Sequence, residues 1–215
     1  DVVGPMPVAA LHATLDYPAE PVPSGTALPP LWHWLYFLPV RRQSELGPDG
    51  HAERGGFLPP VPLPRRMWAG GRFDFRSPLR VGDDVVRTST IENVVPKQGR
   101  TGPLVFVTVR HEVRTNGASD PALVEHHDIV YRAEKQPGEV EPAPTAAAAG
   151  ASWQRTIVPD DVLLFRYSAL TFNGHRIHYD RRYVTEIEGY PGLIVHGPLI
   201  ATLLMDLLRR HAPDA

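Results

Sequence analysis

Two neighbouring stretches near the end of this chain decide its fold. Residues 167–180 read YSALTFNGHRIHYD, and residues 190–199 read YPGLIVHGPL. The first stretch places imidazole and amide side chains in a loop between two apolar runs. The second predicts a helix that begins at His196, Gly197 and Pro198, because proline is favoured in the first turn of a helix. Since a helix N-terminus presents unpaired backbone N–H donors, the two stretches predict an active site.

The bulk composition is that of an ordinary globular protein and excludes several classes of function. The 215 residues suffice for one sizeable core or two small ones, and the net charge of -2 offers no basic field for nucleic acid. The absence of cysteine excludes disulfides and thiolate catalysis, and is compatible with an intracellular protein. We expect no membrane span and no signal segment. Because the chain starts at Asp1, we expect that it is trimmed or incomplete.

Proline divides the first half of the chain. The 24 prolines cluster, and the clusters at residues 18–30 and 57–64 exclude regular helix or central strand there. Between them, residues 31–39 form an aromatic block that packs in a core or lines a ligand cleft. Residues 44–57 are polar and rich in glycine, which predicts an exposed loop.

The chain from Arg72 to Tyr131 has the residue pattern of a β-sheet. Alternating and β-branched residues occur at 72–75, 85–94, 104–113 and 123–131, with glycine and proline between them. This pattern predicts an antiparallel meander of about four strands.

A low-complexity segment at residues 136–151 predicts a linker between two units, 1–135 and 152–215. The second unit is expected to be helical. Its predicted helices open at Pro159 to Asp161, run from Asp180 to about Glu188, and run from about Pro198 to His211. Because apolar residues lie all round the last helix, we expect it to be buried against a sheet.

The motif of residues 168–180 resembles that of the MaoC-like hydratases and dehydratases. The (R)-specific enoyl-CoA hydratases carry Asp-x-Asn-Pro-x-His-x-Asp, followed by His-Gly and a long helix. A closer resemblance is to the subgroup of 3-hydroxyacyl-thioester dehydratases and mesaconyl-CoA and itaconyl-CoA hydratases, which extends to residues 31–39, 55–68 and 78–83. This resemblance implies an α+β double hot-dog fold, two sheets each wrapping a helix, with acyl-CoA between the halves.

The chain departs from the pattern of this family in two ways. Asn173 stands where the (R)-hydratases carry a catalytic Asp. No strands follow the long helix, so we expect the second sheet to be incomplete in this chain.

The resemblance implies catalytic roles for three residues. His178 is the expected proton-transfer group, since an imidazole exchanges protons near neutral pH. Asn173 cannot act as a base, but its amide could hold the attacking water, or it could only cap the loop. The backbone N–H of Gly197 is expected to bind the thioester oxygen while it carries enolate charge.

Four further residues are candidates for substrate binding. His175 and Asp180 could complete the proton path or could simply orient the loop. Arg181 could meet CoA phosphates or a substrate carboxylate, or lie on a solvated face. His196 could also be a helix cap or a packing group.

The sequence favours a hydro-lyase that acts on a small branched or dicarboxylyl enoyl-CoA, such as mesaconyl-CoA or itaconyl-CoA. The alternatives are an (R)-3-hydroxyacyl-thioester dehydratase of fatty-acid synthesis, a hot-dog thioesterase and a non-catalytic acyl-CoA-binding module. A metal site from His175, His178, His196 and Asp180 is a further alternative, although we expect no metal. No cofactor is expected, because CoA is part of the substrate. We also expect a homodimer or larger homo-oligomer, cytoplasmic or in the mitochondrial matrix if eukaryotic, that binds neither nucleic acid nor membrane.

Overall fold

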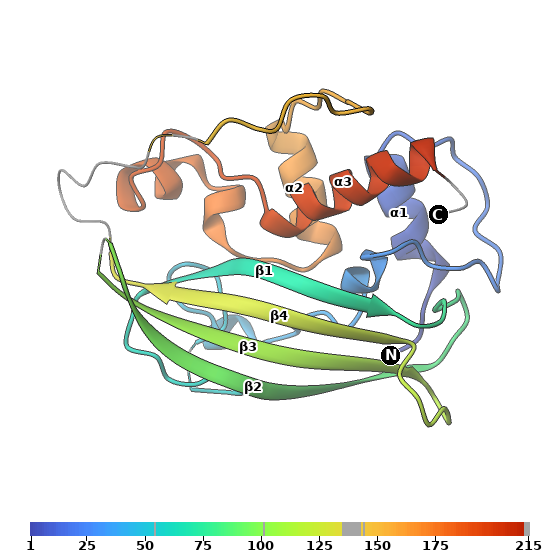
Figure 1. Ribbon diagram of the computed structural model, residues 1–215, viewed down its shortest axis with the longest axis horizontal. Coiled ribbons are helices and arrows are strands. Elements are labelled where there is room, and N and C mark those ends of the chain that lie inside the picture. The colour runs from blue at the N-terminus through green and yellow to red at the C-terminus, as the bar shows by residue number, and fades with distance from the viewer. Residues whose placement is uncertain (54, 101, 135–142, 144, 213–215) are drawn as a thin grey trace.

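The computed structural model describes residues 1–53, 55–100, 102–134, 143 and 145–212. Its centre is one antiparallel sheet of four strands, with helices packed on one face (Figure 1). The strands are β1 (Arg65–Phe75), β2 (Val85–Gly99), β3 (Gly102–Thr115) and β4 (Leu123–Arg132). The described residues thus have the α+β architecture that the sequence predicted, with no second sheet among them.

The predicted meander gives the correct neighbours for β2, β3 and β4, but it is wrong for β1. The strand order is β1-β4-β3-β2, so β1 pairs with β4, from Arg65 opposite Arg132 to Phe75 opposite Leu123. The connection between β1 and β2 crosses the end of the sheet, where the backbone N–H groups of Arg76 and Ser77 both donate to the carbonyl of Ala122. No tight turn joins β1 to β2, so the two strands occupy opposite edges.

A shared hydrophobic core lies between one end of the sheet and the helices. Its helices are α1 (Pro5–Thr14), the 3₁₀ turn η1 (Trp32–Leu35), α2 (Asp161–Leu170) and α3 (Gly197–His211). Leu11, Trp32, Leu123, Leu164 and Leu199 are all buried in this core. Residues from both predicted units therefore pack together, and the division into two units stays a prediction.

The proline-rich segment before β1 covers the other end of the sheet. Val61 packs against Val107, Val109, Ile129 and Tyr131, which all lie on the sheet face that the helices cover. Because side chains alternate along a strand, these residues share their face with Glu125 and His127 in the middle of β4. The middle of that face is therefore polar, while its two ends are apolar.

The helical elements after residue 159 follow the predictions closely. Asp160 caps α2 by accepting a hydrogen bond from the backbone N–H of Leu163 (2.8 Å). The predicted short helix after Asp180 is a π-helical turn, η4 (Tyr183–Ile187). The predicted linker lies largely outside the described residues, since 135–142 and 144 are among those not described.

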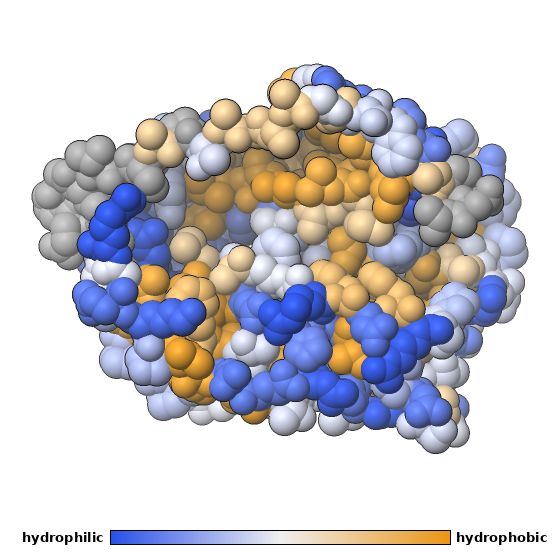
Figure 2. Space-filling model, in the orientation of Figure 1, coloured by the Kyte–Doolittle hydropathy of each residue, from blue (hydrophilic) through white to orange (hydrophobic). Residues whose placement is uncertain are grey.

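The last helix, α3, is less buried than the sequence predicted. Leu199, Thr202 and Asp206 are buried, whereas Ile200 and Leu204 are 49% and 62% exposed. A sheet covers only one side of α3 in the described structure, and Figure 2 shows apolar surface on the side that faces the viewer. No helix among the described residues is long and apolar enough to cross a membrane.

Candidate active site

The loop after α2 is held by hydrogen bonds of its own residues. The Thr171 hydroxyl donates to the carbonyl of Tyr167 (2.8 Å), and the Tyr179 hydroxyl donates to the carbonyl of Gly174 (2.8 Å). Within the loop, the 3₁₀ turn η3 (Arg176–His178) buries Ile177 and His178. The loop therefore presents His178 from a fixed backbone towards the start of α3.

His178 is a buried imidazole with one ring nitrogen engaged in a hydrogen bond. Its Nδ1 lies 2.6 Å from the carbonyl oxygen of Ile194, and a carbonyl can only accept, so Nδ1 carries the proton. The side chain is 7% exposed, and this burial lowers the pKa of His178 to about 4. At neutral pH the ring is uncharged and its Nε2 keeps a lone pair, as a general base requires.

His196 stacks on His178. The ring centroids are 3.7 Å apart, and the Nε2 of His196 lies 2.8 Å from the Ser168 hydroxyl. His196 is 1% exposed, burial lowers its pKa to about 3, and its Nδ1 is buried with no hydrogen-bond partner among the described residues. Its side chain makes no capping hydrogen bond at α3, so it packs against His178 and does not cap the helix.

Gly197 begins α3 directly beside Trp68 of β1. A Cβ on Gly197 would lie 2.5 Å from the indole Cε3 of Trp68, so only glycine allows this approach. Since residues in the first turn of a helix have no acceptor one turn back, the N–H groups of Gly197 and Leu199 are available donors. The structure thus places helix N-terminal donors next to the stacked pair His178 and His196.

Asn173 braces the loop. Its Oδ1 accepts a hydrogen bond from the backbone N–H of His175 (3.0 Å), which is the local capping contact that the sequence analysis weighed. The acceptor atom of the amide is therefore used within the loop. A role for Asn173 in holding water stays a prediction.

Asp180 and Arg181 make contacts of other kinds. Asp180 accepts from Nε and Nη2 of Arg176 (3.0 and 2.8 Å) and from the backbone N–H of Tyr183 (3.0 Å). These contacts favour the interpretation that Asp180 orients the loop. The guanidinium of Arg181 is exposed and pairs with Asp161. The side chains of Asp180 and Arg181 are thus engaged with other residues and not with the ring of His178.

The loop at residues 47–51 is not the exposed loop that the sequence predicted. It packs against the loop of His178: the backbone N–H of Arg176 donates to the carbonyl of Asp49 (2.9 Å), and Nη1 of Arg176 donates to that of Pro48 (2.9 Å). This contact brings in Asp49 and His51, which the sequence analysis missed. The only sequence signal was an Asp and a His two residues apart in a glycine-rich turn.

Four imidazoles form a continuous row in the candidate site. The ring centroids of His51 and His175 are 4.1 Å apart, those of His175 and His178 are 5.4 Å apart, and His178 stacks on His196. Burial lowers the pKa of His175 to about 3. The row therefore combines neutral rings from two distant loops and the N-cap of α3.

A metal could bind at one end of this row. Potential ligand atoms of Asp49, His51 and His175 lie within 4.8 Å of one another. This group differs from the predicted one, since Asp180 is engaged with Arg176. The expectation of no metal stays a prediction.

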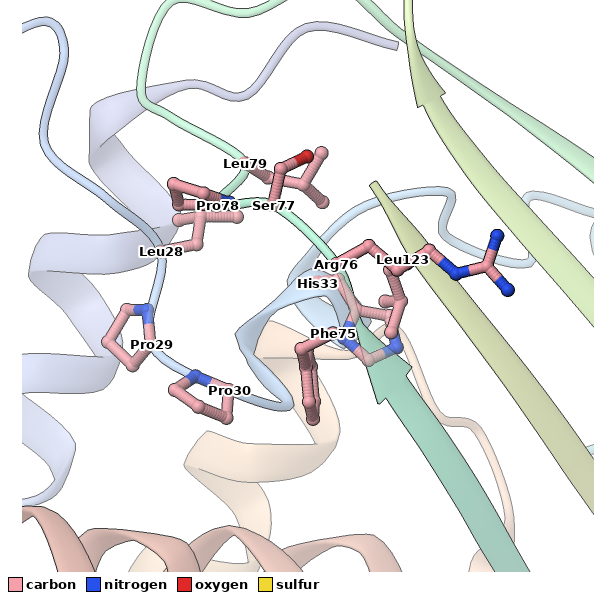
Figure 3. A pocket seen from close by; sticks show the side chains of 10 residues that line it. All are labelled: Leu28, Pro29, Pro30, His33, Phe75, Arg76, Ser77, Pro78, Leu79 and Leu123. Carbon is pink, nitrogen blue, oxygen red and sulfur yellow. The ribbon is translucent and has the colours of Figure 1, made fainter. Parts of the chain in front are cut away.

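An apolar pocket lies elsewhere, at the end of β1. It is lined by the proline-rich segment before η1, with Pro29 and Pro30 on one side and Phe75 and His33 on the other (Figure 3). None of the four imidazoles of the row lines it. The pocket is therefore separate from the row.

The sheet, the helix packed on it and the acid–base row at the helix N-terminus define a hot-dog fold with a site suited to proton transfer. A family profile described as hydroxyacyl-thioester dehydratase type 2 matches residues 31–215. The chain belongs to this family.

Two curated relatives support this assignment. Mesaconyl-C(4)-CoA hydratase of Chloroflexus aurantiacus is 52% identical over 205 residues, which cover 94% of this chain and 71% of the relative. The mitochondrial hydroxyacyl-thioester dehydratase type 2 of Schizosaccharomyces pombe is 27% identical over 240 residues, covering 100% of this chain and 79% of the relative.

Solved structures confirm the hot-dog fold. HtdX of Mycobacterium tuberculosis matches 100% of this chain and 78% of its own, with a TM-score of 0.64 and 17% identity. A second M. tuberculosis protein, described as having a double hotdog fold, matches 99% of this chain and 72% of its own, with a TM-score of 0.55 and 14% identity. At these identities the likeness concerns the fold alone.

Proposed function

We propose that this chain is an acyl-CoA hydro-lyase that adds water to mesaconyl-C4-CoA. The observation that carries the proposal is the free Nε2 of the neutral, buried His178 beside the N-terminus of α3. The 52% identity to a mesaconyl-C(4)-CoA hydratase supports this substrate over other enoyl thioesters.

The site supplies a base and an oxyanion donor for this addition. As the water oxygen bonds to the β-carbon of the thioester, one water proton passes to Nε2 of His178. The electron pair of the double bond moves towards the thioester oxygen, where the N–H of Gly197 stabilises the developing charge. Protonation of the α-carbon then completes the hydration, and the reverse sequence is dehydration.

The base and the oxyanion donor can meet one substrate because both belong to the same packed unit. His178 stacks on His196, and His196 directly precedes Gly197. A thioester whose oxygen approaches the start of α3 therefore places its double bond near the row of imidazoles. Because His178 and His196 are buried, water is largely excluded there and the local dielectric constant is low, which strengthens hydrogen bonds to a developing oxyanion.

Several further properties belong to this proposal. The reaction needs no cofactor, since CoA is part of the substrate and the residues above supply the acid–base chemistry. The homo-oligomeric state and the cytoplasmic location stay predictions that the resemblance to the family implies.

The substrate can be tested by steady-state hydration assays of the intact protein with mesaconyl-C4-CoA, itaconyl-CoA and crotonyl-CoA. Loss of the enoyl-thioester absorbance without release of free thiol is expected, with the highest kcat/KM for mesaconyl-C4-CoA. A higher kcat/KM for crotonyl-CoA would favour the (R)-3-hydroxyacyl-thioester dehydratase. Thiol release would favour a thioesterase, and binding without turnover would favour a non-catalytic module.

A further inference from the structure

In the loop of His178, His175 is the one other imidazole, and no carboxylate hydrogen-bonds to its ring among the described residues. Asn173 is an amide, and the carboxylate of Asp180 is engaged with Arg176 and the backbone of Tyr183. Hydration needs a proton to leave water and a proton to reach the α-carbon. In this row of described residues, an imidazole that a carboxylate orients is found outside the loop, at His51.

Asp49 and His51 form a carboxylate–imidazole dyad at the other end of the row. The Nδ1 of His51 lies 3.0 Å from Oδ2 of Asp49, and the backbone N–H of His51 donates to Oδ1 of the same carboxylate (3.0 Å). Since an ionised carboxylate only accepts, Nδ1 of His51 carries a proton and its Nε2 is the atom that can exchange one.

The hydrogen bonds of the dyad fit this role. Both oxygens of the Asp49 carboxylate accept from His51, one from its backbone N–H and one from Nδ1. The resting ring therefore keeps its proton on Nδ1, and the lone pair of Nε2 can take up a proton and release it. No carboxylate hydrogen-bonds to the rings of His175, His178 or His196 among the described residues.

The position of the dyad is fixed by close packing of two loops. Gly50 has a φ of +87°, and a Cβ at this residue would lie 1.9 Å from the carbonyl oxygen of Gly174. Two hydrogen bonds from Arg176 to the carbonyls of Pro48 and Asp49 hold the same contact. The ring of His51 is thereby held against His175, whose ring also contacts that of His178.

We propose that His51, oriented by Asp49, is the second proton-transfer residue of the hydro-lyase site and protonates the α-carbon. This inference rests on the proposed function. It assigns to residues of the first loop the role that Asn173 cannot perform.

The protons balance over one turnover. His178 takes a proton from water as the C–O bond forms, and this proton passes across His175 or through water to Nε2 of His51. Nε2–H of His51 then gives it to the α-carbon as the enolate collapses, so both rings end neutral as they began. In dehydration Nε2 of His51 takes the α-proton, which passes back to His178 and leaves with the hydroxide as water.

The test compares His51→Gln and Asp49→Asn with His126→Gln in the intact protein, using mesaconyl-C4-CoA. His126 is a matched control, because it lies on β4, pairs with Glu92 (3.4 Å) and makes no ring contact with the row. We expect His51→Gln to lower kcat about 100-fold or more with KM changed less than about threefold, as is usual for loss of a general acid–base group. Asp49→Asn should lower kcat by a smaller factor, and His126→Gln should leave it unchanged.

A second variant separates proton transfer from a structural effect. His51→Ala should lose activity to the same extent, and imidazole added to the assay should restore part of kcat. Near wild-type kcat in His51→Gln, or no rescue of folded His51→Ala by imidazole, would overturn the proposal. Loss of wild-type activity on treatment with a chelator would also overturn it, because Asp49, His51 and His175 would then be metal ligands. An inactive wild type would instead refute the proposed function.

Discussion

Two groups of buried or half-buried histidines in this protein differ in whether a carboxylate lies at the centre of the group. In the first group, the carboxylate of Glu125 lies 3.0 Å from Nε2 of His33 and accepts a hydrogen bond from the indole of Trp34 (3.1 Å). His127 lies 3.8 Å from the same carboxylate. The second group is the row His51, His175, His178 and His196, in which His51 alone has a carboxylate partner within the part of the chain that the structure describes.

The comparison teaches which buried imidazoles are available for chemistry. Glu125 is 3% exposed; burial alone would raise its pKa, but the hydrogen bond from His33 and the nearby imidazoles lower it to about 2. The carboxylate is therefore a permanent charge that ties its neighbours to the sheet. In the row, burial without a carboxylate leaves the rings of His178 and His196 neutral, and His178 keeps a free Nε2.

The largest expected effect separates the two groups by activity. His178→Asn should lower kcat for hydration of mesaconyl-C4-CoA by about 10²–10⁴-fold, since it removes the proposed general base. His33→Asn should leave kcat within about tenfold and should mainly lower stability. Steady-state kinetics of both variants checks this, and equal losses of kcat would remove the distinction between the groups.

For stability, we expect the group around Glu125 to matter more than the row of His178. Glu125→Ala leaves His33 and Trp34 without their buried acceptor and should lower the free energy of unfolding by about 3–5 kcal/mol. Glu112→Ala on β3 is the matched control, because its carboxylate pairs with arginines that are partly exposed. Urea denaturation gives both values, and a loss for Glu125→Ala no greater than for Glu112→Ala would contradict the account.

Displacement of the proposed oxyanion donor should have a smaller effect on kcat than loss of His178. Gly197→Ala forces a Cβ against Trp68 and should shift the start of α3, lowering kcat about 10–100-fold, less than the full loss of a donor. Gly192→Ala is the control, because nothing lies within 4 Å of a Cβ there and its φ is not positive. If the two variants had the same kcat, the N–H of Gly197 would not be the donor.

Protonation of the two groups should lower the stability of the protein in different pH ranges. The pKa values of His178 and His196 are about 4 and 3, below 6.5, so the unfolded state binds more protons and stability falls as pH drops below about 6.5. Glu125, with a pKa of about 2 against 4.5, contributes stability that is lost only between about pH 4.5 and 2. Urea denaturation at several pH values should show that His178→Asn flattens the first range and Glu125→Gln the second. A His178→Asn curve parallel to that of the wild type between pH 6.5 and 4 would show that folding does not lower the pKa of this ring.

The sequence predicted those elements whose signals are local. Asp160 at the start of α2, Pro198 in the first turn of α3 and the alternating strands each act within a few residues. The motif around His178 predicted the proposed base and, through Gly197, the proposed helix donors. These predictions needed no knowledge of the tertiary contacts.

What the sequence missed depends on contacts between distant residues. The pairing of β1 with β4 and the docking of residues 47–51 on Gly174 and Arg176 join segments that no local pattern relates. Because no local pattern signals this docking, the sequence predicts residues 44–57, which include Asp49 and His51, as an exposed loop. Helix α1 was also missed, because its apolar residues do not follow one face clearly.

The central claim is that His178 is a neutral imidazole with a free Nε2, and ¹⁵N NMR of the histidine side chains tests it most directly. Long-range ¹H–¹⁵N spectra at pH 7, assigned with His178→Asn, distinguish the two neutral tautomers from the imidazolium. The account predicts that Nδ1 of His178 is protonated and Nε2 is not. A protonated Nε2 at pH 7, in either the charged ring or the other tautomer, would contradict it.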